Sequence, residues 1–151
     1  MEIINKMNKY AFLFITSMAL ATPSNFLQHP KVFSLHQNQA KFAHDIGNLL
    51  LYIYGQGYSC SLGEGYRTEE QAILYAKEGK GIRHSQHCIR LALDIDLFSP
   101  SGEYLTHSKD YEIFGKYWVS LDPHHNRWGG DFHSGAIGDG NHFERQERDL
   151  L

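Results

Sequence analysis

The chain has 151 residues, of which 42% are hydrophobic and 21% charged, a composition typical of one globular domain. At this length a folded chain buries roughly two thirds of its unfolded surface, so a hydrophobic core can form without disulfide or metal staples. The net charge of −3 and the lack of basic clusters interleaved with aromatic residues argue against nucleic acid as a partner. Ten histidines are a high count and give the first indication of metal chemistry.

Residues 1–21 have the layout of a secretory signal peptide. Lys6 and Lys9 precede an apolar run, and Ala19-Leu20-Ala21 fits a small-x-small cleavage pattern. The run is too short for a transmembrane helix, and no other segment of the sequence is apolar enough, so we expect no stable membrane insertion. In the alternative, translation starts at Met18 and the protein has an ordinary cytosolic N-terminus.

The rest of the chain, residues 22–151, is expected to form a single domain. The first predicted element is a helix that begins after a capping box made by Ser34 and Gln37. The apolar residues that recur with helical spacing, and the glycines that end this helix, are Phe42, Ile46, Leu49, Leu50, Ile53, Gly55 and Gly57.

Residues 58–66 are predicted to form a strand. Thr68 and Gln71 then make a second capping box, which opens a short helix that Gly79 closes. The residues that follow are polar, and they predict a loop.

The second half of the chain predicts a buried strand at Ala92–Phe98 and a third helix that starts near Ser108. Residues 122–140 are rich in glycine, histidine and aspartate and predict a long functional loop, and residues 141–145 predict a last short strand. Separate helices and strands without a βαβ rhythm favour an α+β fold, with a small antiparallel sheet flanked by helices.

His87 and Asp94 are the first candidate metal ligands. Zinc binds histidine nitrogen and carboxylate oxygen at about 2.0–2.2 Å, so both side chains must reach one point. Seven residues of extended strand would separate them by about 23 Å, and an odd spacing places them on opposite faces. The chain must therefore bend between them, within residues 88–91, if both bind one ion. Asp96 shares a strand face with Asp94 and is the rival carboxylate.

The second half of the candidate site is the segment 139–144, which contains Asp139, His142 and Glu144. A histidine with a nearby acid, placed after a glycine-rich stretch, suits a third ligand and a general base. Three protein ligands leave the fourth position of zinc for water, as in catalytic sites. Taken alone each signal is weak, because Asp139 could cap a turn and the histidines could lie on the surface.

In chain order, these residues resemble the signature of the D-Ala-D-Ala peptidase family: Ser85-x-His87, Ala92-x-Asp94 and Asp139-x-x-His142. That family includes carboxypeptidases, vancomycin-resistance dipeptidases and phage endolysins that cut L-alanyl-D-glutamate bonds. The resemblance implies a hedgehog/DD-peptidase-like fold with one Zn²⁺ per chain. It implies that His87, Asp94 and His142 hold the zinc ion and that Asp139 is the catalytic base.

A second segment extends the resemblance. Gly65-Tyr66-Arg67-Thr68 followed by Gln71 is similar to the family's G-Y-R-T/S-x-x-Q pattern, in which the arginine stabilises the developing oxyanion. The resemblance therefore implies a catalytic role for Arg67. It also implies substrate contacts from Gln71 and from Trp128, which begins a loop like the one before the last ligand in small phage-type members. Ser85 is expected either to bind substrate as well or to orient His87.

The chain departs from the family at Arg90, where most members have glycine. This position lies inside the required bend, where glycine would be easiest to accommodate. Arg90-Leu91-Ala92 resembles a variant of the phage-type members, so we interpret it as the mark of a subgroup.

The resemblance implies a zinc metallopeptidase that hydrolyses peptidoglycan stem peptides, and the small size and the variant at Arg90 favour an endolysin-like L-alanyl-D-glutamate endopeptidase. The alternatives are a D-Ala-D-Ala carboxypeptidase or dipeptidase, a zinc hydrolase of another small amide, and a catalytically silent, zinc-stabilised wall-binding or virion module. Asp139 argues against the last, because a structural site needs no base. We expect a monomer, which is exported if the signal peptide is real and otherwise a cytoplasmic phage-type protein released at lysis.

Overall fold

The computed structural model describes residues 33–132 and 139–147, so the candidate signal peptide lies outside the described residues. Helix α1 (Leu35–Gly55) begins at the expected capping box. The Ser34 side chain accepts a hydrogen bond from the Gln37 N–H at 3.3 Å, and the Gln37 side chain accepts one from the Ser34 N–H at 2.9 Å. This pairing satisfies two backbone donors at the start of the helix.

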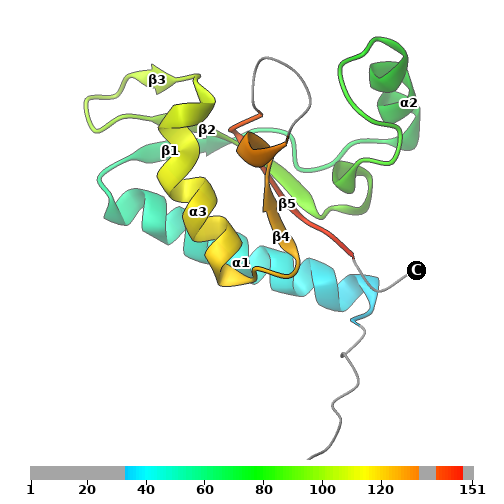
Figure 1. Cartoon of the computed structure of the whole chain (residues 1–151), viewed down its shortest axis with the longest axis horizontal. Coiled ribbons are helices and arrows are strands. Elements are labelled where there is room, and N and C mark those ends of the chain that lie inside the picture. Colours follow the sequence, from blue (N-terminus) through cyan, green and yellow to red (C-terminus); the bar gives the residue numbers. More distant parts are fainter. Residues whose placement is uncertain (1–32, 133–138, 148–151) are drawn as a thin grey trace, which may run out of the picture. The chain divides into compact units, whose positions relative to one another are not determined.

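Five antiparallel strands form the sheet, in the order β1-β2-β5-β4, and β3 pairs with β2 (Figure 1). Their bounds are Ser59–Leu62 (β1), Ala92–Phe98 (β2), Tyr104–Leu105 (β3), Asn126–Trp128 (β4) and His142–Arg145 (β5). Together with three α-helices they confirm the predicted α+β class.

The central strand β2 sends alternate side chains to two different environments. Ile95 and Leu97 have no exposed surface and belong to the hydrophobic core. Asp94 pairs across the ladder with His142 of β5, whereas its neighbour Leu93 pairs with Phe143, which is a core residue. Because side chains alternate along a strand, one face of β2 and β5 builds the core and the other carries the candidate metal ligands.

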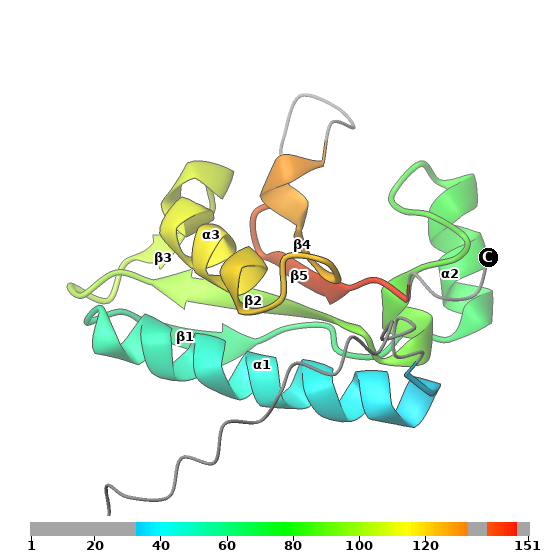
Figure 2. The ribbon, with the colours of Figure 1, turned by 60° about the horizontal axis from the view of Figure 1, so that its bottom comes forward.

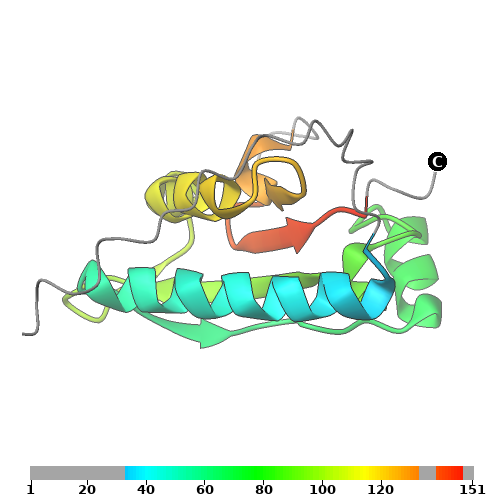
Figure 3. The same ribbon diagram turned by 90° about the horizontal axis from the view of Figure 1, so that it is seen from below.

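Helices α1 and α3 (Glu112–Leu121) pack against each other and supply much of the core. Figures 2 and 3 show α1 running along the sheet. Trp118 of α3 has no exposed surface and makes edge contacts with Phe42 of α1 and Phe143 of β5, at ring-centroid distances of 5.6 and 6.1 Å. Its indole N–H donates to the Glu144 carbonyl at 3.2 Å, so the core helix also holds β5 in place.

Helix α2 (Glu69–Lys77) lies at one end of the sheet (Figure 1). The Thr68 hydroxyl caps it by accepting a hydrogen bond from the Gln71 N–H at 3.2 Å, as predicted. The helix ends before Gly79, which adopts a left-handed backbone with φ of 70°. Glycine is favoured there because it has no side chain to clash in this conformation.

The observed elements differ from the predicted ones in four places. Strand β1 ends at Leu62 instead of continuing to Tyr66, β3 was not expected, and the third helix is divided into a 3-10 turn η2 (Ser108–Tyr111) and α3. The predicted long loop contains β4 and a 3-10 turn η3 (Gly129–Asp131), and residues 133–138 lie outside the described part.

Cys60 and Cys88 are both free thiols, so they do not form a disulfide. Among the residues that the structure describes, no helix has the length and apolar character needed to cross a bilayer.

Candidate metal centre and cleft

His87, Asp94 and His142 come together at one point, although 48 residues separate the last two in the chain. The Asp94 Oδ1 atom lies 3.0 Å from His142 Nδ1 and 3.4 Å from His87 Nε2, and the two ring nitrogens are 3.2 Å apart. Among the described residues 33–132 and 139–147, these three side chains are the group whose ligand atoms lie close enough together to hold one metal ion.

The pairing of β2 with β5 explains how two of the three candidate ligands, Asp94 and His142, come together. Asp94 and His142 are directly opposite each other in the ladder, so their side chains leave the sheet on the same face. The backbone of Asp94 is also fixed on its other edge, because its N–H donates to the Glu64 carbonyl at 3.0 Å and its own carbonyl accepts from the Gly63 N–H at 2.8 Å.

A tight turn brings His87 to the same point. The 3-10 turn η1 (Gln86–Ile89) begins at Ser85, whose hydroxyl accepts a hydrogen bond from the His87 N–H at 3.3 Å. The turn ends at Arg90, which has φ of 55° and ψ of 41° and is the only left-handed non-glycine residue in the described part of the chain. The bend predicted between His87 and Asp94 is therefore present, and arginine adopts there a conformation that usually favours glycine.

The imidazole of His142 is oriented by carboxylates on both of its nitrogens. Nδ1 lies 3.0 Å from Asp94, and Nε2 lies 3.1 Å from the Glu144 carboxylate, two residues further along the same strand face. Burial opposes protonation of this ring, but the hydrogen bonds to Asp94 and Glu144 outweigh it and raise the pKa of His142 to about 9. Burial raises the pKa of Asp94, but the hydrogen bonds and charges of His142 and His87 prevail and lower it to about 2.

This donor set fits a divalent metal ion. An ion with tetrahedral bonds of about 2.0–2.2 Å holds its ligand atoms about 3.4 Å apart, close to the observed spacing. Two imidazoles and one carboxylate are ligands that zinc accepts, and Glu144 supplies the carboxylate that commonly orients a metal-binding histidine through its other nitrogen. His87 is 1% exposed and His142 7%, so the site is shielded from most of the solvent.

The candidate ligands form one wall of a cleft of about 590 Å³. Arg67, Ser85 and Asp139 line the same cleft, so three more of the residues singled out from the sequence are gathered here. The rest of its lining comes from the loop after α2, from the residue that follows η3 and from β5: Gly79, Lys80, Gly81, Ile82, Phe132 and Glu144.

Asp139 is held by the backbone of its own turn. Its carbonyl accepts a hydrogen bond from the His142 N–H at 3.1 Å, and the next residue, Gly140, donates to the Ser108 hydroxyl at 3.1 Å. Partial desolvation raises the pKa of Asp139 above its usual value, and the Asp94 carboxylate adds to this rise, although the cationic groups of the cleft oppose it.

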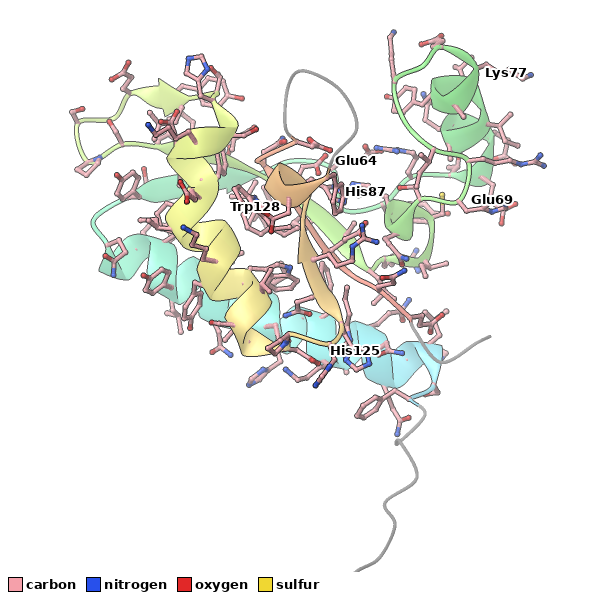
Figure 4. All side chains as sticks on the ribbon, viewed as in Figure 1. Glu64, Glu69, Lys77, His87, His125 and Trp128 are labelled. Carbon is pink, nitrogen blue, oxygen red and sulfur yellow. The ribbon has the colours of Figure 1, made fainter. Side chains whose placement is uncertain are left out.

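Arg67 is tied to both halves of the site. Its guanidinium pairs with the Glu64 carboxylate through Nε at 3.0 Å and through Nη2, and its backbone N–H donates to the His87 carbonyl at 3.3 Å. The guanidinium also stacks on the Tyr75 ring, 4.9 Å from its centroid. In Figure 4 the labelled side chains of Glu64 and His87 lie in the same region, between η3 and α2.

Gln71 and Trp128 are not among the residues that line this cleft. Trp128 is 6% exposed, and its indole N–H donates to the Gly140 carbonyl at 2.7 Å. Its ring packs so closely on Gly115 and Gly130 that a Cβ at either position would overlap it. Trp128 therefore supports the turn that carries Asp139, and direct substrate contacts from these two residues stay predictions.

The structure also separates the two candidate carboxylates on β2. Asp96 accepts hydrogen bonds from the Tyr104 hydroxyl at 3.1 Å and from the Ser61 hydroxyl at 3.4 Å, and it is not part of the candidate ligand cluster. Sequence reasoning did not find Glu64 or the orienting role of Glu144. The two-residue spacing between His142 and Glu144 could have indicated this role, because residues two apart on a strand point to the same face.

No protein-family model and no curated protein matches this chain. Among solved structures, the chain is similar to the L-Ala D-Glu endopeptidase ChiX of Serratia marcescens, with a TM-score of 0.59 and 18% sequence identity. The similarity covers 85% of this chain and 98% of ChiX. At 18% identity this similarity shows a shared fold and nothing further.

Proposed function

We propose that this protein is a zinc-dependent endopeptidase that cuts the L-alanyl-D-glutamate bond of peptidoglycan stem peptides. The observation that carries the proposal is the convergence of His87, Asp94 and His142 on one point, with Asp139 in the same cleft. A metal held by three protein ligands leaves room for substrate, and a nearby carboxylate that does not belong to the ligand cluster suits catalysis. The fold shared with a protein named as an L-Ala D-Glu endopeptidase supports the choice of bond.

The three candidate ligands, Asp139, Arg67 and Ser85 have distinct tasks in this reaction. Zinc bound by the three ligands would supply positive charge that polarises the scissile carbonyl and makes nearby water more acidic. Asp139 accepts a proton from the attacking water and passes it to the leaving amine. Arg67 donates hydrogen bonds to the carbonyl oxygen as that oxygen gains negative charge. Ser85 keeps His87 in place through its hydrogen bond to the backbone.

The test is digestion of purified peptidoglycan by the zinc-loaded protein, followed by mass spectrometry of the products. We expect new amino termini on D-glutamate, about one zinc per chain, and loss of both metal and activity after chelation. His87→Ala and His142→Ala should have the effect of chelation. Glu103→Gln, an exposed carboxylate in the turn between β2 and β3, is the matched control and should keep both.

The other outcomes of this digestion each assign a different function. Release of D-alanine would make the protein a D-Ala-D-Ala carboxypeptidase. Binding to the cell wall without any cleavage would favour the silent module. New reducing sugar ends, or full activity in exhaustively chelated protein, would end the metallopeptidase proposal.

We also propose that the protein acts outside the cytoplasm, because peptidoglycan is found there. The candidate signal peptide, with Lys6, Lys9 and Ala19-Leu20-Ala21, would provide the route. N-terminal sequencing of protein recovered from producing cells should then begin near Thr22. A mature protein that begins at Met1 or Met18 would contradict cleavage and leave release at lysis as the route.

A further inference from the structure

The carboxylate of Glu64 holds the guanidinium of Arg67 by a two-point contact. It accepts one hydrogen bond from Nε at 3.0 Å and a second from Nη2. Such a pair fixes the plane of the guanidinium as well as its position, which a contact through one atom cannot do. The Arg67 side chain is 11% exposed and that of Glu64 30%, so the pair is partly shielded from the water that weakens surface ion pairs.

The remaining contacts of Arg67 leave one edge of the guanidinium for the cleft. Tyr75 lies against its face, with the ring centroid 4.9 Å from Cζ. Nε and Nη2 are engaged by Glu64, and Nη1 is at the opposite edge of the planar group. Nη1 lies next to Gly81, where an added Cβ would be 3.5 Å away, and both Gly81 and Arg67 line the cleft.

The same short segment is connected by its backbone to both halves of the ligand cluster. The Glu64 carbonyl accepts a hydrogen bond from the Asp94 N–H at 3.0 Å, and the Arg67 N–H donates to the His87 carbonyl at 3.3 Å. The backbone of Glu64 is thus bonded to Asp94, and the backbone of Arg67 is bonded to His87. The side chains of Glu64 and Arg67 pair with each other. The two backbone hydrogen bonds fix the backbone of both residues relative to the candidate metal site.

We propose that Glu64 is a positioning residue, which holds Arg67 so that Nη1 faces the oxygen that becomes negative during peptide hydrolysis. This inference rests on the proposed function. Donors aimed in advance at a developing charge are worth more than mobile ones, because no reorganisation is needed when the charge forms. Without Glu64 the arginine keeps its charge but can rotate, and a small misplacement of a catalytic group costs up to about 100-fold in rate.

The first test is the kinetics of Glu64→Gln, alone and combined with Arg67→Ala. Glutamine has the same size but lacks the charge and the second oxygen acceptor. We expect kcat to fall about 10- to 100-fold with little change in KM, while zinc content and Tm stay near wild type. In the Arg67→Ala background the same substitution should change kcat less than about twofold, because Glu64 acts through Arg67. Glu112→Gln is the control, since Glu112 pairs with Lys116 on the exposed face of α3.

The second test does not depend on activity. In the wild-type protein the Arg67 Nε–H should give a resolved, slowly exchanging NMR signal, which Glu64→Gln removes and Glu112→Gln leaves unchanged. An unchanged Nε–H signal in Glu64→Gln, or equal losses of kcat in both backgrounds, would overturn the inference. Loss of zinc from Glu64→Gln would also overturn it, by making Glu64 a support of Asp94. A wild-type protein that cuts no peptide removes the proposed function, and the NMR comparison still decides whether Glu64 fixes Arg67.

Discussion

Asp94 and Asp139 are carboxylates beside the same cluster, but their surroundings suit them to different tasks. Hydrogen bonds with the two histidines outweigh burial and hold the pKa of Asp94 at about 2, so Asp94 stays an anion. Desolvation and the nearby Asp94 charge raise the pKa of Asp139. A pair of carboxylates whose environments push their pKa values apart commonly divides into a permanently ionised group and a proton carrier. This division matches a ligand and a base.

At these two residues, substitution by asparagine should separate the roles. Asp139→Asn keeps the size of the side chain but cannot accept a proton, so turnover should fall about 10²- to 10⁴-fold, while zinc content and Tm stay near wild type. Asp94→Asn should lose zinc, and stability with it, because the anionic ligand is gone. Metal analysis, thermal melts and peptide hydrolysis on both variants would check this. If Asp139→Asn loses zinc while Asp94→Asn keeps it, the two roles are exchanged.

At the scale of elements, the sequence predicted those parts of the fold that depend on local signals. The capping residues Ser34 and Thr68 and the bend before Asp94 are present, because capping and chain geometry act over a few residues. Strands β3 and β4 were missed, since two and three residues are too few for a periodic pattern and their pairing depends on distant strands. The Arg67–Glu64 pair was missed because several contacts are possible for an arginine and only the fold selects one.

The turn that carries Asp139 is built on the close approach of η3. A Cβ at Gly129 would lie 2.9 Å from the Cβ of His142 and 3.1 Å from that of Asp139, and closer still to the Asp139 carbonyl. Real side chains essentially never pack so tightly, so any other residue at this position must push the turn away. Position 129 therefore requires glycine because the turn that carries Asp139 packs directly against it. The sequence pattern alone did not indicate this requirement.

Gly129→Ala should lower the stability of the protein by about 1–3 kcal/mol, the usual cost of forcing extra volume into a packed site. Turnover should fall as well, because both Asp139 and His142 must shift. Gly55→Ala is the matched control, since a Cβ at Gly55 would meet open space. Thermal melts and zinc titrations of both variants would check this, and equal behaviour of the two alanine variants would contradict it.

At the scale of the whole domain, Arg145 joins elements that are far apart in the chain. It follows the candidate ligand His142 on β5, has no exposed surface, and donates through Nε to Asn38 of α1 at 3.0 Å. Nη1 donates to the Asp122 carboxylate, at the end of α3, at 2.8 Å. A buried guanidinium is costly unless it is paired, and removing the partner of a buried charge costs more than the pair itself contributes. The strand that carries the candidate ligand His142 therefore depends on Asp122.

The stability of the domain should consequently fall in acid as Asp122 becomes protonated. Burial opposes ionisation of Asp122, but hydrogen bonds from Arg145 and His125 prevail and lower its pKa from 3.8 to about 2. Because the folded state binds this proton more weakly than the unfolded state, the contribution is fully present above about pH 4 and is lost as the pH falls toward 2. Allowing for solvent around a partly exposed carboxylate, it amounts to about 1–2 kcal/mol.

Urea unfolding of the metal-free wild type and of Asp122→Asn, from pH 7 to pH 2, would measure this contribution. Asp122→Asn should be less stable at pH 7, since Arg145 keeps its charge and loses its anionic partner. The stability of Asp122→Asn should fall less between pH 4 and 2 than that of wild type. The curves of stability against pH for the two proteins should therefore approach each other at the acid end. Glu103→Gln, which removes an exposed carboxylate in the turn after β2, is the control for loss of a carboxylate and should be as stable as wild type at pH 7. Parallel curves for wild type and Asp122→Asn would mean that Asp122 is not the group whose ionisation stabilises Arg145, and that β5 is held by the neutral contacts with Asn38 and Asn126 instead.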